Sequence, residues 1–263
     1  MPLKSDISID VAKFAPQNTP AQTAEANENL INILKDGPKW FERFLPRDDD
    51  RMIPCRLVYP SWRKTFEERR KTRAIKCLTH GGGWVLGDQH SADTLLQFYA
   101  DAGDLAVISV GYRLAPEYPF PCGPNDCIDV GEYLARNGEL AFGSSLRFIW
   151  GRECWCPSIF AYAFLPGMTN EQKKNPLISP YYENLEKFRG RLPSALFTCG
   201  TEDPLLDDSV TMATKWMMTG GEAFIKVYTG APHSFIGLAD MLKEARDAQE
   251  DTKTYIKDCM TKL

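Results

Sequence analysis

The chain has 263 residues, of which 43% are hydrophobic and 25% are charged, and its formal net charge at pH 7 is -4. This composition is typical of a soluble globular protein, and the length suffices for one large hydrophobic core. The weakly acidic balance gives no electrostatic basis for binding nucleic acid or an anionic membrane, and no apolar run is long enough to cross a bilayer. We therefore expect a single domain over residues 1–263, with no nucleic-acid partner and no membrane span.

The first residues, "MPLKSDISIDVAKFAPQ", lack the apolar core of a signal peptide. The eight cysteines are scattered along a chain that is too large to need disulfide bonds for stability. Reduced thiols and a cytoplasmic location are therefore expected. Cys154 and Cys156 lack the paired C-x-x-C spacing of a zinc site, so no metal site is predicted.

Two segments are expected along the chain. Residues 1–50 are predicted as a polar, partly helical N-terminal segment, in which Leu30, Ile33 and Leu34 have helical spacing. Residues 51–263 alternate between short apolar strands and helices, which indicates an α/β fold with a mostly parallel central sheet. The expected strands are residues 53–60, 74–80, 105–112, 146–151, 194–200 and 223–230, and the expected helices are residues 126–138, 207–221 and 238–263.

The middle of the chain breaks this alternation. Between the strands at 146–151 and 194–200 the sequence contains no clear strand. We therefore expect the sheet to lack one central strand-helix unit.

A glycine-rich stretch, "THGGGWVLGD", follows the strand at 74–80. Glycines placed directly after a strand let several backbone N–H groups approach one point, and such a group of donors stabilises an oxyanion. Gly81 and Gly82 are the candidate donors, and His80 is expected to shape the loop rather than to act as a base. A glycine-rich turn without any ligand is the alternative for this motif taken alone.

Two further candidates follow the last two strands. Asp203 lies in "CGTEDPLLDD" and His233 in "YTGAPHSF", so both are expected on loops at the carboxyl edge of a sheet, where α/β active sites assemble. A carboxylate that holds a histidine in one tautomer, with the histidine as general base, makes up two thirds of a nucleophilic triad. Taken singly, Asp203 is equally consistent with a turn residue or a helix cap.

Together, "HGGGW", "YRLAPE", "GTEDPLLDD" and "PHSF" resemble the hormone-sensitive-lipase-like branch of the α/β-hydrolase fold, a family of carboxylesterases. The resemblance implies that Gly81 and Gly82 form the oxyanion hole, that Asp203 orients His233, and that His233 is the general base. It also implies a small ester as substrate, no cofactor, and a cap formed by the N-terminal helices. Nothing in the sequence defines an oligomeric state.

The family's nucleophile is a serine in a G-x-S-x-G elbow between a strand and a helix, where the strained turn needs small neighbours. In this chain the register after "LRFIW" reads Gly151, Arg152, Glu153, Cys154, Trp155, so Glu153 occupies the position of the serine. Moving the register by one residue makes Cys154 the nucleophile but places an arginine at a crowded position. Ser144, Ser145 and Ser158 lack the flanking glycines.

A one-base frameshift accounts for this disruption. "WGRECW" can be encoded as TGG GGG AGA GAG TGC TGG, and deleting one G from the run of five gives TGG GGA GAG AGT GCT GG, which reads W-G-E-S-A-G. These codons are one choice among synonyms, and the printed residues are compatible with such a deletion. The hypothesis is that a shifted frame, or a misplaced splice site, removed the serine and the following segment from an active parent. The alternative is a non-catalytic pseudohydrolase that binds a small hydrophobic ligand.

Overall fold

The computed structural model describes residues 41–46, 52–142, 148–152 and 158–262. These residues fall into two compact units. The larger unit contains the described residues up to Lys187 together with Glu250 to Lys262, and the smaller unit contains residues 188–249. The expectation of one hydrolase domain over the whole chain stays a prediction.

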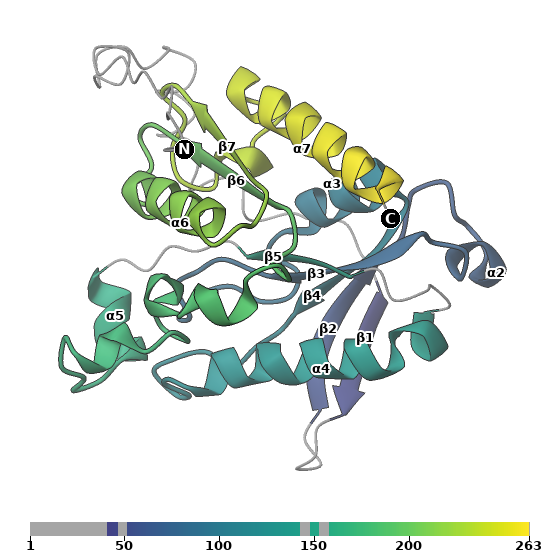
Figure 1. Ribbon diagram of the computed structural model, residues 1–263. Coiled ribbons are helices and arrows are strands. Elements are labelled where there is room, and N and C mark those ends of the chain that lie inside the picture. The colour runs from purple at the N-terminus through teal and green to yellow at the C-terminus, as the bar shows by residue number, and fades with distance from the viewer. Residues whose placement is uncertain (1–40, 47–51, 143–147, 153–157, 263) are drawn as a thin grey trace. The chain divides into compact units, whose positions relative to one another are not determined.

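The larger unit is built on a five-stranded sheet (Figure 1). Its strands are β1 (Phe41–Pro46), β2 (Met52–Val58), β3 (Ala74–Thr79), β4 (Leu105–Val110) and β5 (Phe148–Arg152), in the order β1-β2-β4-β3-β5. β3 runs parallel to both β4 and β5, whereas β2 is antiparallel to β1 and to β4. The sheet is therefore mixed, and within it the prediction of parallel pairing is confirmed for β3, β4 and β5.

β3 and β4 are buried on both faces, and alternate side chains of each strand enter different hydrophobic clusters. Leu105 and Val107 of β4 pack with Leu96 of helix α3 (Asp93–Gly103), whereas Ala106 and Ile108 pack with the start of helix α4 (Cys122–Phe142). This alternation follows from the two-residue period of a strand. α3 and α4 thus cover opposite faces of the sheet (Figure 1).

α4 continues to Phe142, past the glycine at position 138 where the sequence analysis ends it. That boundary was wrong because an interior glycine costs a helix only about 1 kcal/mol and does not by itself terminate it.

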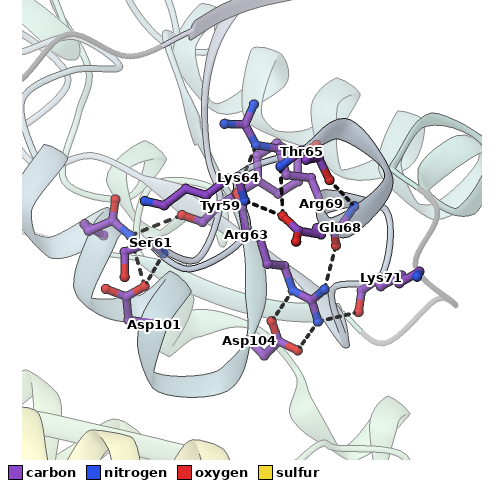
Figure 2. Close-up of polar contacts among 11 residues, drawn as sticks. Tyr59, Ser61, Arg63, Lys64, Thr65, Glu68, Arg69, Lys71, Asp101 and Asp104 are labelled. Carbon is purple, nitrogen blue, oxygen red and sulfur yellow. Dashed lines mark hydrogen bonds and ion pairs between the residues drawn. The ribbon is translucent and has the colours of Figure 1, made fainter.

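The loop between β2 and β3 contains a basic run, residues 69–73, and is hydrogen-bonded to the residue that follows α3, Asp104 (Figure 2). The Arg63 guanidinium forms two 2.6 Å hydrogen bonds with the Asp104 carboxylate, and it also donates to the backbone carbonyls of Glu68 and Lys71. Thr65 and Glu68 exchange side-chain and backbone hydrogen bonds at the start of the short helix α2 (Phe66–Arg69). The run is therefore an ordered loop at the edge of the sheet where β3 begins.

The smaller unit contains two parallel strands, β6 (Ala195–Gly200) and β7 (Ala223–Tyr228), joined by helix α6 (Leu206–Met218). A separate hydrophobic cluster forms around Phe235 and Leu242, and it includes Ala245 and Ala248 at the start of helix α7 (Lys243–Thr261). The strands and helices predicted for this region are present, but the last helix begins at Lys243 instead of residue 238, and α6 ends at Met218 instead of residue 221. The end of α7 belongs to the larger unit.

Residues 158–193 contain no strand, in agreement with the sequence analysis. They form helix α5 (Ser158–Phe164) and three short 3-10 helices (Gln172–Lys174, Pro180–Tyr182 and Leu185–Phe188). Ser158 is the first residue of α5. Residues 1–40, which carry most of the expected cap, lie outside the described residues, and residues 41–46 form an edge strand instead of a helix.

Candidate active site

The glycine loop begins where β3 ends. Gly82 has a φ of +111°, and a Cβ built on it would lie 2.0 Å from the carbonyl oxygen of Leu86, so only glycine fits this position. The N–H groups of Val85 and Leu86 both donate to the Gly82 carbonyl and close a tight turn. The sequence thus places glycine where the backbone folds back on itself.

His80 and Tyr112 meet because β3 and β4 are parallel neighbours whose carboxyl ends share one edge, with Thr79 opposite Val110. The His80 ring is 2% exposed and stacks on the Tyr112 ring with centroids 4.1 Å apart. Its Nδ1 lies 2.7 Å from the Gly81 carbonyl oxygen, which can only accept, and 3.2 Å from the Tyr112 hydroxyl. The shorter contact assigns the proton of the neutral ring to Nδ1. Burial lowers the pKa of His80 below 6.5 and keeps the ring neutral.

The N–H groups of Gly81 and Gly82, the predicted oxyanion donors, belong to partly exposed residues. In the part of the chain that the structure describes, neither N–H donates a hydrogen bond to a protein acceptor. Two adjacent backbone donors are therefore available to a ligand.

The segment from Gly111 to Pro121 packs against this loop. Trp84 stacks on Phe164 of α5 at 5.3 Å and contacts Tyr112 at 4.7 Å, and its carbonyl accepts the Ala115 N–H at 2.9 Å. The Arg113 guanidinium forms a bidentate ion pair with the buried Asp126 carboxylate. These contacts hold the glycine loop from the side of β4.

In the smaller unit, Asp203 and His233 are hydrogen-bonded, with 3.0 Å between Asp203 Oδ2 and His233 Nδ1. The other carboxylate oxygen accepts the N–H of Leu205 at 2.8 Å. Burial raises the pKa of Asp203, but the hydrogen bonds from His233 and Leu205 outweigh burial, and the pKa lies below 3.8. The carboxylate is thus ionised and faces the histidine ring.

The loops that carry this pair are joined by backbone hydrogen bonds. The N–H of Thr201 donates to the Tyr228 carbonyl at 3.0 Å, the N–H of Glu202 donates to the Ala231 carbonyl at 3.1 Å, and the N–H of Gly230 donates to the Thr201 hydroxyl at 2.7 Å. The two loops follow β6 and β7, and the parallel pairing of these strands brings both loops to one edge of the sheet. The pair is therefore positioned by the sheet.

The structure thus brings together Asp203 with His233, and Gly81 with Gly82, each pair within its own unit. Glu153, at the disrupted nucleophile position, and Cys154 lie outside the described residues. Tyr112 was not singled out by the sequence analysis, although its place directly after β4 could have pointed to it.

Within the described ranges, no cluster of three or more His, Cys, Asp or Glu side chains could hold a metal ion. No described helix combines the length and the apolar character needed to span a bilayer.

A protein-family profile described as alpha/beta hydrolase fold matches residues 77–154 and 156–237, which is more than half of the chain. The chain belongs to the α/β-hydrolase family. Among curated relatives, this α/β-hydrolase is 25% identical to ethyl acetate hydrolase of Pseudomonas putida over 247 residues, covering 75% of this chain and 76% of that protein. It is 41% identical to esterase LipI of Mycobacterium tuberculosis over 137 residues, covering 52% of this chain and 38% of that protein.

The chain is 33% identical to arylesterase of Saccharolobus solfataricus, and this match covers 40% of that relative, which is less than two thirds of its length. Among solved structures, carboxyl esterase 2 of Tuber melanosporum superposes with a TM-score of 0.75 at 14% identity, covering 92% of this chain and 99% of that chain. An arylesterase structure gives a TM-score of 0.66 at 20% identity over 90% of this chain and 91% of that chain. The α/β-hydrolase fold and the membership in a family of carboxylic ester hydrolases are thus confirmed.

Proposed function

We propose that the site of this α/β-hydrolase is built for hydrolysis of small carboxylic esters by acyl transfer. The observation that carries the proposal is the 3.0 Å hydrogen bond between Asp203 and His233. It leaves Nε2 of His233 as the ring nitrogen that can take a proton from a nucleophile and return it to a leaving alcohol.

Each remaining part has its role in that reaction. Asp203 holds the tautomer of His233 and stabilises the imidazolium as it forms. The N–H groups of Gly81 and Gly82 donate to the oxyanion of the tetrahedral intermediate. A serine at the elbow attacks the ester carbonyl, the alcohol leaves, and water hydrolyses the acyl-enzyme by the same proton path.

The chain as written lacks that serine, since Glu153 occupies its register position. We propose that it is the frameshifted or mis-spliced form of an active parent, and the family match supports this by dividing at Trp155, within the disrupted elbow. Loss of a triad nucleophile costs about 10⁶ in kcat. The chain itself is therefore expected to be inactive.

The missing central unit is part of the same proposal, and the exposure of the last two strands supports it. Side chains of β6 from Ala195 to Thr198 are only partly buried, and Phe224 and Val227 of β7 are 43% and 38% exposed. β3 and β4, by contrast, are buried throughout. Parallel strands are normally covered on both faces, so this exposure is expected where a strand and its helix are lost.

The lengths of the alignments support it as well. The alignment with ethyl acetate hydrolase runs over 247 residues yet covers only 75% of the 263 residues of this chain. That relative therefore has several tens of positions without a counterpart here.

The second candidate is a pseudohydrolase that binds a small hydrophobic ligand. The observation in its favour is the absence of the serine from the chain as written, whereas the intact Asp203–His233 pair argues for the esterase parent. Binding of a short ester without its hydrolysis, by a stably folded chain, is what this candidate predicts.

The test compares three proteins on short p-nitrophenyl esters: the chain as written, the product of the restored reading frame, and that product with the elbow serine changed to alanine. We expect hydrolysis only by the restored product. If the restored product is folded and hydrolyses none of these esters, the proposal is wrong. Saturable ester binding by the chain as written would then support the pseudohydrolase.

A further inference from the structure

The carbonyl groups of His80 and Gly81 each belong to the same peptide unit as one of the two candidate oxyanion donors. A peptide unit is planar and trans, so the C=O of one residue and the N–H of the next point in opposite directions. The His80 carbonyl shares its peptide with the Gly81 N–H, and the Gly81 carbonyl shares its peptide with the Gly82 N–H. Fixing either carbonyl therefore fixes the direction of one donor.

Both carbonyls are held by side-chain hydrogen bonds. The Tyr112 hydroxyl donates to the His80 carbonyl oxygen at 2.7 Å. The protonated Nδ1 of His80 donates to the Gly81 carbonyl oxygen at 2.7 Å. The first bond comes from the loop after β4, and the second comes from within the glycine loop itself. The Tyr112 hydroxyl also lies 3.3 Å from the Gly81 carbonyl oxygen and 3.2 Å from His80 Nδ1, and its bond to the His80 carbonyl is the shortest of the three.

We propose that Tyr112 and His80 are positioning residues that aim the N–H groups of Gly81 and Gly82, Tyr112 mainly through the His80 carbonyl and His80 mainly through the Gly81 carbonyl. The inference rests on the proposed function, because aimed donors matter where an oxyanion develops. Donors that are oriented before the reaction need no reorganisation during it, and this preorganisation is the main source of their catalytic effect.

The surroundings make the two bonds rigid. Tyr112 is 5% exposed and His80 is 2% exposed, and their stacked rings are tilted by only 10°. A Cβ built on Gly87 would lie 2.9 Å from His80 Nδ1, so the loop also closes around the ring from that side. Buried His80 Nε2 has no hydrogen-bond partner in the described part of the chain, which leaves Nδ1 as the donor that anchors the ring.

The test measures the directions of the two N–H groups by residual dipolar couplings in the ¹⁵N-labelled full chain. Tyr112→Phe keeps the stacked ring and removes the hydroxyl, so we expect the Gly81 coupling to change and the Gly82 coupling to stay closer to its original value. His80→Phe removes the Nδ1 donor, so the Gly82 coupling should change. Tyr162→Phe, which alters a side chain that is 82% exposed on α5, is the control and should change neither.

Unchanged Gly81 and Gly82 couplings in both variants would overturn the proposal. The unsubstituted chain provides a check that does not depend on the variants folding: ¹⁵N shifts of the His80 ring must show the proton on Nδ1. A proton on Nε2 instead would overturn the proposal as well.

The catalytic consequence is read in the restored, serine-containing product. There Tyr112→Phe should lower kcat roughly tenfold or more while KM stays nearly constant, because removing a whole donor costs about 10²–10³ in kcat. An unchanged kcat would contradict a positioning role. If the restored product hydrolyses no ester, the proposed function fails, whereas the couplings still decide whether Tyr112 and His80 aim the donors.

Discussion

The carbonyl oxygen of Ala231 lies so close to Gly200 that a Cβ built on Gly200 would come within 1.8 Å of it. The same oxygen accepts the N–H of Glu202 at 3.1 Å. Gly200 and Ala231 thus bring the loop of Asp203 against the loop of His233, and the absence of a side chain at position 200 sets their spacing.

Gly200→Ala should force these loops apart. Because the clash involves backbone atoms and cannot be relieved by a side-chain rotation, we expect the free energy of unfolding to fall by about 2 kcal/mol or more. Thermal denaturation and the NMR signals of the His233 ring measure the change. Gly237→Ala is the matched control, since a Cβ there meets no atom within 4 Å. Equal stability of the two variants would contradict this account.

Asp203→Asn should change the response of the protein to acid. The pKa of Asp203 is below its usual 3.8 in the folded chain, so its ionised form stabilises the fold at higher pH and this contribution is lost as the pH falls through 3.8 and below. The variant should therefore be less stable than the original chain at pH 6, and the difference should shrink below pH 3.8. A difference in urea midpoints that stays constant from pH 6 to pH 2.5 would be evidence against the pairing.

His80 should make stability depend on pH in a higher range. Its pKa is lowered from 6.5 by burial, so the unfolded chain takes up a proton that the folded chain does not. Stability is then full above pH 6.5 and falls as the pH drops from 6.5 toward the lowered pKa. The His80→Phe variant should be less stable than the original chain at pH 8. Its free energy of unfolding, measured with urea, should fall less than that of the original chain between pH 8 and pH 5. The same slope in both proteins would contradict the burial of a neutral ring.

The buried ion pair between Arg56 of β2 and Asp93 of α3 should be costly to break. The Arg56 guanidinium makes two hydrogen bonds to the Asp93 carboxylate, at 3.0 and 2.7 Å, and the side chains are 2% and 7% exposed. Asp93→Ala removes the carboxylate that pairs with the buried Arg56 guanidinium, which should cost about 3–5 kcal/mol. Replacing both residues by leucine and methionine should recover much of this loss in a denaturant titration. A double variant as unstable as the single one would mean that the pair itself stabilises the fold.

Local patterns were sufficient to predict the elements whose burial is uniform. β3 and β4 are continuous apolar runs that are buried on both faces, and the loops after β6 and β7 were expected to carry Asp203 and His233 together. β1 was missed because an edge strand is defined largely by its pairing, here with β2, and not by its own pattern. Tyr112 was missed because its role depends on a hydrogen bond to the carbonyl of His80, which is 32 residues away in the chain.

Sequencing the genomic DNA and the transcript across codons 146 to 170 decides whether this α/β-hydrolase is the disrupted form of a serine esterase. We expect one reading frame there to encode G-E-S-A-G after "FIW", followed by the missing strand and helix. Codons for Arg152, Glu153 and Cys154 that no single-base change converts to this motif, with the shortened middle present in the gene, would contradict it.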